Sequence, residues 1–281
     1  MNKMKWNGMP GFADRPRRPK ARKRKEPSMN QESPSMLDLV IELHKSLDRL
    51  GPGSAEATER ALGFIDGIDS MGRVLDLGCG TGAQTFVLAK HIPGAITGVD
   101  LFPDFIDVFN ARAEKLGLQG RVVGKQGSMD DLDIPFESVD LIWCEGAIDG
   151  VGFAKMLAYW KAFLKPGGYV GITCPSWLTA ARVDEVDEFW TQAGSGLDTV
   201  ADNVAALQDA GYATVATFVL PKACWTENYF VPRRAAESGL LKKYPDSKAV
   251  EEFIAGNHYE ESLFSEHGDR YGYVFYIAKK I

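Results

Sequence analysis

The chain of 281 residues has no long apolar segment, few cysteines and only four histidines. No apolar run approaches the roughly 18 residues that a membrane-spanning helix needs, and no apolar stretch of the kind found in secretory signals is present. The cysteines (Cys79, Cys144, Cys174 and Cys224) are far apart and form no Cys-x-x-Cys pair, which is typical of reduced thiols. These absences predict a cytoplasmic protein with no membrane partner.

Acidic side chains are scarce near the N-terminus, where basic side chains are concentrated. Ten Lys or Arg residues and one acid, Asp14, occur between residues 3 and 25, so the rest of the chain is strongly acidic. A block of like charge broken by prolines predicts a disordered tail over residues 1–34. The tail is either a nucleic-acid-binding or nuclear-signal segment or an extension upstream of a start at Met29 or Met36, and we favour the extension. The acidic body would repel a phosphate backbone, so we predict that the core does not bind nucleic acid.

A glycine-rich turn is the most informative motif. Gly78, Gly80 and Gly82 follow an apolar strand pattern that contains Asp76, and a helical pattern opens at Ala83. Backbone N–H groups and a helix N-terminus therefore face whatever binds there. The dinucleotide fingerprint is Gly-x-Gly-x-x-Gly, whereas here every second residue is glycine. A carboxylate at Asp76 would repel a pyrophosphate and attract an ammonium group.

Further motifs follow in a fixed order. Asp100 ends the next predicted strand, where one carboxylate can accept hydrogen bonds from both hydroxyls of a ribose. Phe136 with the segment 138–143, and then Leu-Lys-Pro-Gly-Gly at 164–168, complete the set. Together with the glycine turn, these motifs resemble those of class I S-adenosylmethionine-dependent methyltransferases. The chain is similar to small-molecule enzymes such as the quinone-biosynthesis C-methyltransferases, and to uncharacterised bacterial methyltransferases with a Glu-Gly-Ala-Ile segment.

The resemblance implies S-adenosyl-L-methionine as the cofactor. It places Asp76 near the ammonium group and Asp100 at the ribose, with Met129 packed on the adenine ring and Asp130 accepting from its amino group. The full set of cofactor-binding residues that it implies is Asp76, Gly78, Cys79, Gly80, Thr81, Gly82, Asp100, Leu101, Ser128, Met129, Asp130 and Glu145.

The residues that bind the methyl acceptor are expected after the fourth predicted strand. Glu145 is expected beside the methyl group as a general base or an acceptor-orienting group, or else it satisfies backbone donors or contacts the methionine end of the cofactor. His258 is a second candidate base. Four aromatic residues are expected either to line an acceptor pocket or to pack in the core; they are Trp177, Trp225, Tyr229 and Tyr259.

Three cysteines, Cys79, Cys144 and Cys174, fall at the predicted carboxyl ends of strands. A thiol cluster there would bind a soft metal or metalloid, whereas small residues also suit crowded strand ends. Because no metal-ligand spacing is present, we predict no metal site.

The alternation of strands and helices predicts an α/β fold with a doubly wound, seven-stranded, mostly parallel, Rossmann-like sheet. The predicted methyltransferase domain, 35–281, has N-terminal helices in 35–70, a cofactor-binding core in 71–175, and substrate-side helices with the final strands in 176–281. The helices of that last part are expected to cover the carboxyl edge of the sheet. The expected helices are 36–50, 54–66, 83–91, 103–117, 152–164, 181–191, 199–210, 224–243 and 247–264, and the expected strands are 73–77, 96–100, 121–126, 138–143, 169–173, 214–220 and 271–279.

The predicted function is methyl transfer to a small-molecule acceptor by in-line displacement. The alternatives are an RNA- or protein-directed methyltransferase that uses the basic tail, and a non-catalytic S-adenosylmethionine-binding protein. The motifs leave open the acceptor atom, the pathway and the oligomeric state, for which a homodimer is one option.

Overall fold

The computed structural model describes residues 34–281. The predicted tail, except for Pro34, therefore lies outside the described residues, and so do the roles predicted for it. Of the two candidate translation starts, Met29 lies outside the described residues and Met36 lies within them. Within the described part of the chain, no helix combines the length and the apolar character needed to cross a membrane.

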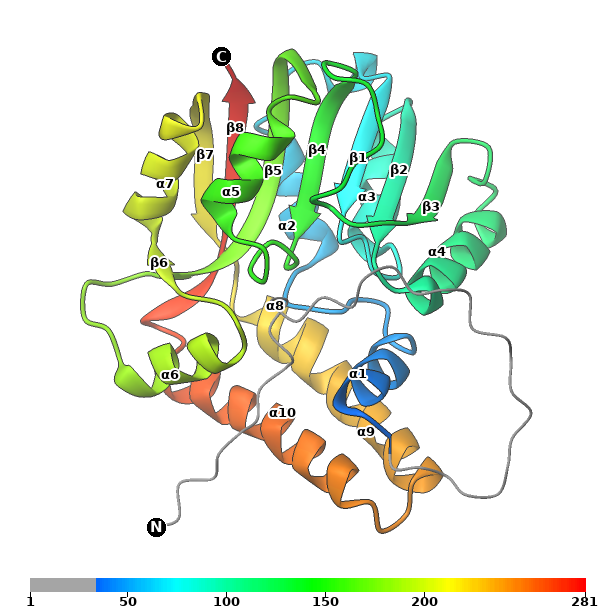
Figure 1. Cartoon of the computed structure of the whole chain (residues 1–281), viewed down its shortest axis with the longest axis vertical. Helices are drawn as coiled ribbons and strands as arrows, with labels where there is room; N and C mark the ends of the chain where they lie inside the picture. The colour runs from blue at the N-terminus through cyan, green and yellow to red at the C-terminus, as the bar shows by residue number, and fades with distance from the viewer. Residues whose placement is uncertain (1–33) are drawn as a thin grey trace.

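A single mixed sheet forms the centre of the molecule, with strand order β3-β2-β1-β4-β5-β8-β7 (Figure 1). The first five strands of this order pair in parallel, and β8 is antiparallel to both of its neighbours. The two-residue strand β6 pairs with β5 beside this path. The doubly wound, mostly parallel sheet predicted from the sequence is thus confirmed, with β6 as a small addition. The strands are β1 Arg73–Leu77, β2 Ala95–Asp100, β3 Val122–Gln126, β4 Val139–Glu145, β5 Leu164–Trp177, β6 Asp198–Thr199, β7 Tyr212–Val219 and β8 Tyr271–Lys280.

Both faces of the sheet are covered by helices, as the continuous apolar character of its strands requires. Successive residues of a strand point to opposite faces, so Leu141 and Trp143 pack with α2, α3 and α4, whereas Ile142 and Cys144 pack with α5 and α7. The helices are α1 Met36–His44, α2 Ala55–Leu62, α3 Ala83–His91, α4 Pro103–Lys115, α5 Phe153–Trp160, α6 Asp184–Gln192, α7 Val200–Asp209, α8 Ala223–Trp225, α9 Val231–Lys243 and α10 Lys248–His267, with a 3-10 turn η1 Ile68–Ser70 and a π-helix η2 Thr226–Phe230.

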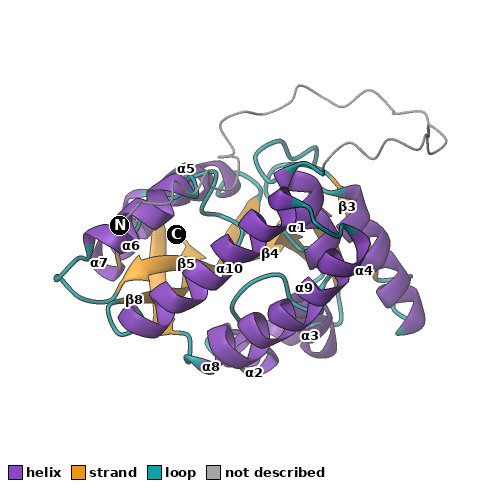
Figure 2. Cartoon of the chain, turned by 90° about the horizontal axis from the view of Figure 1, so that it is seen from below, coloured by secondary structure: helices purple, strands orange, loops and turns teal. Residues whose placement is uncertain are grey.

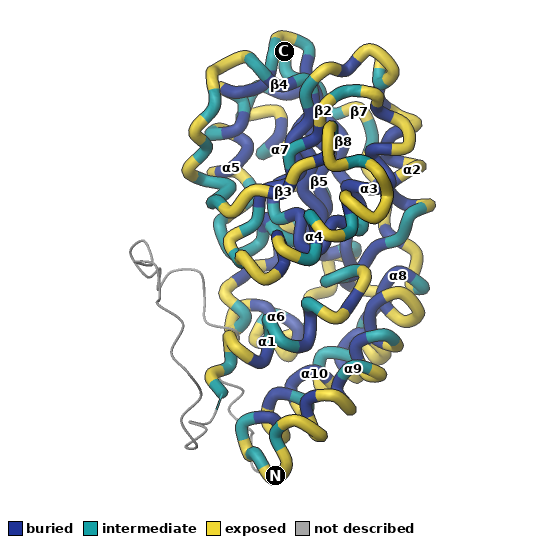
Figure 3. The backbone as a smooth tube through the Cα atoms, turned by 90° about the vertical axis from the view of Figure 1, so that its right-hand side faces the viewer, coloured by how far each residue is buried: buried dark blue, intermediate teal, exposed yellow. Residues whose placement is uncertain are grey.

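A third group of helices covers the carboxyl ends of the parallel strands. In Figure 1, α1, α9 and α10 lie together below the sheet, with α6 beside them, and Figure 2 shows this layer from below. These three helices share their own apolar cluster, which includes Leu39, Leu43, Leu240, Val250 and Phe253. Figure 3 shows that the outer faces of α9 and α10 are exposed while their inner faces are buried. A cavity can therefore form between this cover and the sheet.

The first helix is shorter than the sequence predicts. Ser35 caps its N-terminus, but α1 ends at His44 instead of continuing to residue 50. Beyond that point the carbonyls of Leu47 and Asp48 accept hydrogen bonds from Thr81 Oγ1 at 3.2 and 3.1 Å. The turn therefore brings the N-terminal segment onto the glycine turn, which a continued helix would not do.

The fifth strand is longer than predicted, because β5 continues to Trp177 rather than ending at residue 173. Its last residues pair with the start of β8, from Cys174 opposite Val274 to Trp177 opposite Tyr271. This extension carries β8 past the carboxyl ends of the neighbouring parallel strands. Tyr273 thereby reaches the edge where ligands bind in such sheets.

Gly171 in β5 provides a test of the packing between the sheet and Trp143. A Cβ atom at Gly171 would lie 2.3 Å from the Trp143 ring, whereas a Cβ atom at Gly196 would meet nothing within 4 Å. We expect Gly171→Ala to lower the free energy of unfolding by about 1–3 kcal/mol, because the indole must shift within a packed core. Urea denaturation measures this, with Gly196→Ala as the matched control. Equal stability of the two variants would contradict the packing described here.

Candidate active site

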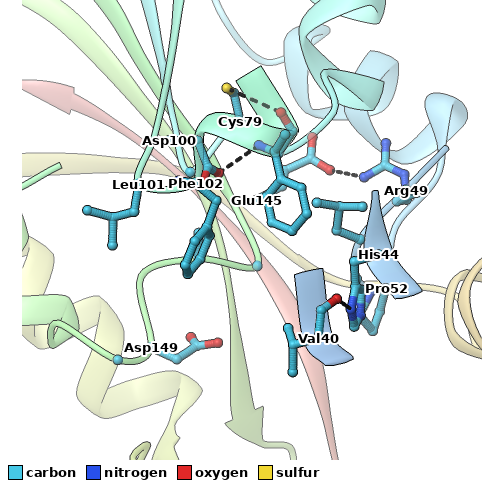
Figure 4. A pocket seen from close by; sticks show the side chains of 18 of the residues that line it. Val40, His44, Arg49, Pro52, Cys79, Asp100, Leu101, Phe102, Glu145 and Asp149 are labelled. Atoms are coloured by element: carbon cyan, nitrogen blue, oxygen red, sulfur yellow. Dashed lines mark hydrogen bonds and ion pairs between the residues drawn. The ribbon is translucent and has the colours of Figure 1, made fainter. Parts of the chain in front are cut away.

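A cavity of about 300 Å³ lies at the carboxyl ends of the parallel strands (Figure 4). The glycine turn, the end of β2, and the loops after β3 and β4 form its sheet side. The segment 48–52 and residues of α1, α6, η2, α10 and β8 form its other side. Open α/β sheets bind ligands at this edge, and the volume suits a small molecule.

The glycines of the turn allow very close approach of neighbouring groups. Gly78 and Gly80 have φ angles of +72° and +52°, which favour glycine. A Cβ atom at Gly78 would lie 2.2 Å from the Ala147 side chain, and one at Gly80 would lie 2.5 Å from Leu50 Cδ1. The backbone of the turn thus faces the cavity directly, with Leu50 packed over it.

Asp100 links the glycine turn to the end of β2. Its Oδ2 accepts from the Gly80 N–H at 2.9 Å, and its Oδ1 accepts from the Phe102 N–H at 3.0 Å. Burial raises the pKa of this carboxyl group, although the backbone N–H groups act in the opposite direction. Each oxygen keeps further capacity to accept, so Asp100 can bind a ligand hydroxyl while it holds the turn.

The loop after β3 lies beside Asp100. Leu101, Ser128 and Met129 line the cavity, and the Met129 carbonyl accepts from the Trp160 indole N–H at 2.8 Å. Asp130 accepts a short hydrogen bond from Ser128 Oγ and is not among the lining residues. In this arrangement, the Asp130 carboxylate is not directed into the cavity for its predicted contact with an adenine amino group. Ser128 stands nearer the cavity.

Asp76 lies beneath the cavity rather than in its wall. Its carboxylate accepts from Gln84 Nε2 at 3.3 Å and from Thr85 Oγ1, and burial raises its pKa to about 7. Gln84, in contrast, lines the cavity. Asp76 is therefore not positioned for the predicted direct contact with an ammonium group, and its carboxylate instead holds the side chain of Gln84.

Some of the remaining predicted cofactor-binding residues line the cavity and others do not. Cys79 and Thr81 line the cavity, whereas Gly82 does not and serves as the N-cap of α3. Gly82 has a φ angle of +93° there.

Glu145 holds the N-terminal segment against the sheet. Its Oε2 accepts from Arg49 Nη1 at 2.7 Å, and its Oε1 accepts from Thr58 Oγ1 at 2.7 Å and from Trp143 Nε1 at 2.8 Å. Only 2% of the Glu145 side chain is exposed. With three donors on one carboxylate, the geometry favours an anchoring role over the predicted role as a proton acceptor.

The second predicted base, His258, is placed away from the cavity. Its Nε2 lies 2.9 Å from Glu237 Oε2, about half of its side chain is exposed, and it does not line the cavity. The reason is the face of α10 on which it lies. Asn257 and Glu260 of the same helix line the cavity instead.

Only one of the four predicted substrate-binding aromatics lines the cavity, and it is Tyr229. Trp225 stacks on Phe264 with ring centroids 4.3 Å apart, and Trp177 is fully buried in the same cluster. Tyr259 is exposed and donates to a carboxylate of α6. Of the two alternatives given for these aromatics, both tryptophans therefore follow the second, packing in the core.

The three strand-end cysteines do not form a thiolate centre. Burial raises the pKa values of Cys79, Cys144 and Cys174 well above their usual value, so the thiols stay protonated. Among residues 34–281, no group of three or more His, Cys, Asp or Glu side chains is arranged to hold a metal ion.

Several lining residues were not anticipated from the sequence. His44 donates from Nδ1 to the Val40 carbonyl at 2.8 Å, and burial lowers its pKa to about 4, so its ring is neutral. Asp149 follows Glu145 by four residues in the loop after β4, and Tyr273 of β8 donates to its Oδ2 at 3.0 Å. The Glu-Gly-Ala-Ile segment, which directly precedes Asp149, is a sequence signal that could have pointed to this residue. No local pattern could have pointed to Tyr273, because its position in the cavity depends on the topology of the sheet.

The charge of the lining is acidic. The carboxylates that reach the cavity are those of Asp48, Asp100, Glu145, Asp149 and Glu260. The guanidinium of Arg49 also lines it but is paired with Glu145. Such a lining attracts a cation and disfavours a pyrophosphate.

The anchoring role of Glu145 is testable through stability. We expect Glu145→Gln to lower the free energy of unfolding by about 3 kcal/mol, because Arg49 loses its buried counter-charge. Guanidinium denaturation measures this loss. Glu261→Gln is the control, since it removes a more exposed ion pair with Arg234 and should cost less than about 1 kcal/mol. Similar values for both variants would show that Glu145 is not an anchor.

Comparisons with known proteins indicate a methyltransferase domain. Residues 74–168 match the family model described as a methyltransferase domain. Erythromycin 3''-O-methyltransferase of Saccharopolyspora erythraea is 38% identical over 111 residues, which are 38% of this chain and 35% of that enzyme. The match thus spans about a third of that relative's length.

Two other relatives match over most of their length. The uncharacterised protein YjhP of Escherichia coli is 28% identical over 219 residues, covering 77% of this chain and 86% of YjhP. A methyltransferase of Geobacter sulfurreducens, solved with S-adenosyl-L-homocysteine, has a TM-score of 0.73 and 22% identity, covering 86% of this chain and 98% of its own. The structural likeness shows the fold, and the family model identifies residues 74–168 as a methyltransferase domain. The chain as a whole is similar to class I S-adenosylmethionine-dependent methyltransferases.

Proposed function

We propose that this chain transfers a methyl group from S-adenosylmethionine to a small-molecule acceptor in the cavity described above. The observation that carries the proposal is the combination of a glycine turn, Asp100 and an acidic lining around one cavity. An adenosine-bearing cation fits this combination, because its ribose needs an acceptor and its charge needs carboxylates.

The residues that would hold the cofactor follow from their positions. Asp100 would accept from the ribose hydroxyls, and Leu101 and Met129 would pack on the adenine ring. The backbone of Gly78 and Gly80 would contact the part of the ligand between the ribose and the amino acid end. Gln84, fixed by Asp76, offers polar groups at that end.

The enclosure of the cavity is the protein's second contribution. When bound, a sulfonium cofactor supplies an activated methyl group, so much of the rate can come from positioning and exclusion of water. The Gly51–Gly53 turn covers the site: the Gly53 N–H donates to the Cys224 carbonyl at 3.3 Å, and Asn228 Nδ2 donates to the Gly53 carbonyl at 2.9 Å. These contacts hold the turn in place over the site.

The acceptor side favours a small molecule. It is lined by the rings of Phe189, Trp190, Tyr229 and Tyr273 and closed by the cover helices. An enclosed, aromatic-rich site suits a compact organic acceptor. The likeness to erythromycin 3''-O-methyltransferase, a small-molecule enzyme by its name, supports the same class.

Asp100 provides the test of cofactor binding. We expect Asp100→Ala to weaken S-adenosylmethionine binding by about 100-fold or more, because it removes hydrogen bonds to a charged acceptor worth about 1.5–3 kcal/mol each. Isothermal titration calorimetry measures the dissociation constant, with circular dichroism as the check on folding. Asp100→Asn, which keeps one acceptor oxygen, should lose less affinity for S-adenosylmethionine than Asp100→Ala does.

The control is Asp107→Ala, which changes an exposed carboxylate on α4. It should bind the cofactor as the parent chain does. Unchanged affinity in a folded Asp100→Ala variant would refute the ribose assignment.

A further inference from the structure

Asp149 and Tyr273 form a pair in the wall of the cavity. Tyr273 Oη donates to Asp149 Oδ2 at 3.0 Å, and both residues line the cavity. Asp149 comes from the loop after β4, and Tyr273 comes from β8, which is distant in sequence. Figure 4 shows the Asp149 carboxylate pointing toward the interior of the cavity from that loop.

The second oxygen of this carboxylate has no partner. Asp149 Oδ1 is buried and makes no hydrogen bond among residues 34–281. An unsatisfied buried polar atom costs roughly 1–3 kcal/mol, so such atoms in folded proteins call for an explanation. A hydrogen-bond donor brought by a ligand would satisfy it.

We propose that Asp149 is the general base of the reaction, and that the acceptor attacks through an oxygen or nitrogen atom that carries a proton. This inference rests on the proposed function of the cavity. Asp149 Oδ1 accepts the hydrogen bond from the acceptor, while Tyr273 holds Oδ2 and thereby orients the carboxylate. Tyr273 is a positioning residue in this scheme.

The proton step balances without a further reactant. The O–H or N–H bond of the acceptor breaks, its electron pair stays on the attacking atom, and its proton passes to Asp149 Oδ1. The carboxylic acid formed returns this proton to water after the product leaves. Acceptors that attack through a group with no proton to lose have no use for Asp149.

The surroundings suit a base that works near neutral pH. Burial raises the pKa of Asp149 to about 7, and the hydrogen bond from Tyr273 opposes this rise. A base is most effective when its pKa lies near the working pH. The titratable groups that face this pair are Tyr273 on β8, Cys144 on β4, Cys174 on β5, Tyr229 on η2 and Glu260 on α10.

Those neighbours leave Asp149 without a counter-charge. The pKa values of Cys144, Cys174, Tyr229 and Tyr273 are all raised by burial, so these groups are neutral at pH 7. Glu260 is an acid and is paired with Arg233. Glu145 differs from Asp149 in this respect, because Arg49 and two further donors already occupy its carboxylate.

The first experiment measures the titration of Asp149 directly. Carboxyl carbon NMR of the chain bound to S-adenosylhomocysteine should show a carboxyl group that titrates near pH 7 and is missing from Asp149→Asn, whereas the signal of Asp76, whose pKa burial also raises to about 7, is present in both. In Tyr273→Phe this titration should move to higher pH, because the hydrogen bond that favours the anion is lost. A titration below pH 5, or one unmoved in Tyr273→Phe, would overturn the proposal.

The second experiment measures methyl transfer from labelled S-adenosylmethionine to three probes. Catechol and benzylamine offer O–H and N–H groups, and thiophenol is the comparison because it ionises readily by itself. Asp149→Asn should lower kcat on catechol or benzylamine by about 100-fold or more and change transfer to thiophenol by less than about 2-fold. In the parent chain, kcat on the first two should rise with pH through about 7 and then level off, since only the ionised carboxylate accepts a proton.

Cofactor binding separates this inference from the proposed function. In calorimetry, Asp149→Asn should weaken S-adenosylmethionine binding far less than Asp100→Ala does, and the control Asp107→Asn should bind it as the parent chain does. Weakened binding with unchanged kcat in Asp149→Asn would overturn the base role and make Asp149 a cofactor contact. If the parent chain binds no S-adenosylmethionine, the proposed function is wrong. If the chain binds the cofactor but methylates none of the three probes, the NMR titration alone tests whether Asp149 is the base.

Discussion

The buried carboxylate of Glu145 is the constraint on which the shape of the site depends. A charge at the end of a central strand, out of contact with water, is tolerated only with several donors around it. Trp143 supplies one from the same strand, whereas Arg49 and Thr58 come from the N-terminal segment. The electrostatic requirement of β4 is thus met by residues almost a hundred positions earlier. Meeting it brings residues 47–58 over the glycine turn, which is how an edge of an open sheet becomes an enclosed cavity.

Other carboxylates at this edge are less well satisfied. Burial raises the pKa values of Asp76 and Asp149 to about 7, and it raises that of Asp100 as well. A raised pKa means that ionising these groups costs folding free energy: their contribution to stability is greatest at low pH and falls as the pH rises through the folded-state pKa. A cation bound among them would reverse part of that cost. The site is therefore less stable than it could be and is prepared for a positively charged ligand, a trade-off typical of functional sites.

The sequence predicts the part of the site that is built from short-range order. The strand from Arg73 to Leu77 and the helix from Ala83 to His91 lie where their patterns place them, because apolar periodicity and glycines act locally. The faces of the later helices could not be predicted in the same way. On α10, His258 and Asn257 are neighbours, yet only Asn257 lines the cavity, because packing against α9 and the sheet decides the rotation of the helix. Arg49 and Tyr273 reach the site only through tertiary contacts that no local pattern encodes.

This division also explains why the family likeness identifies the donor side better than the acceptor side. The methyltransferase model matches residues 74–168, which include the glycine turn, Asp100 and Asp149. The rings that line the proposed acceptor side, Trp190, Tyr229 and Tyr273, all lie outside that segment. Asp149 and Tyr273 therefore join a residue inside the matched segment to a residue of β8, which lies outside it. The orientation of the carboxylate, and with it the kind of acceptor that can lose a proton to Asp149, depends on how β8 and the cover pack against the sheet. Changes in that packing would alter acceptor chemistry while leaving the Asp100 side of the cavity intact.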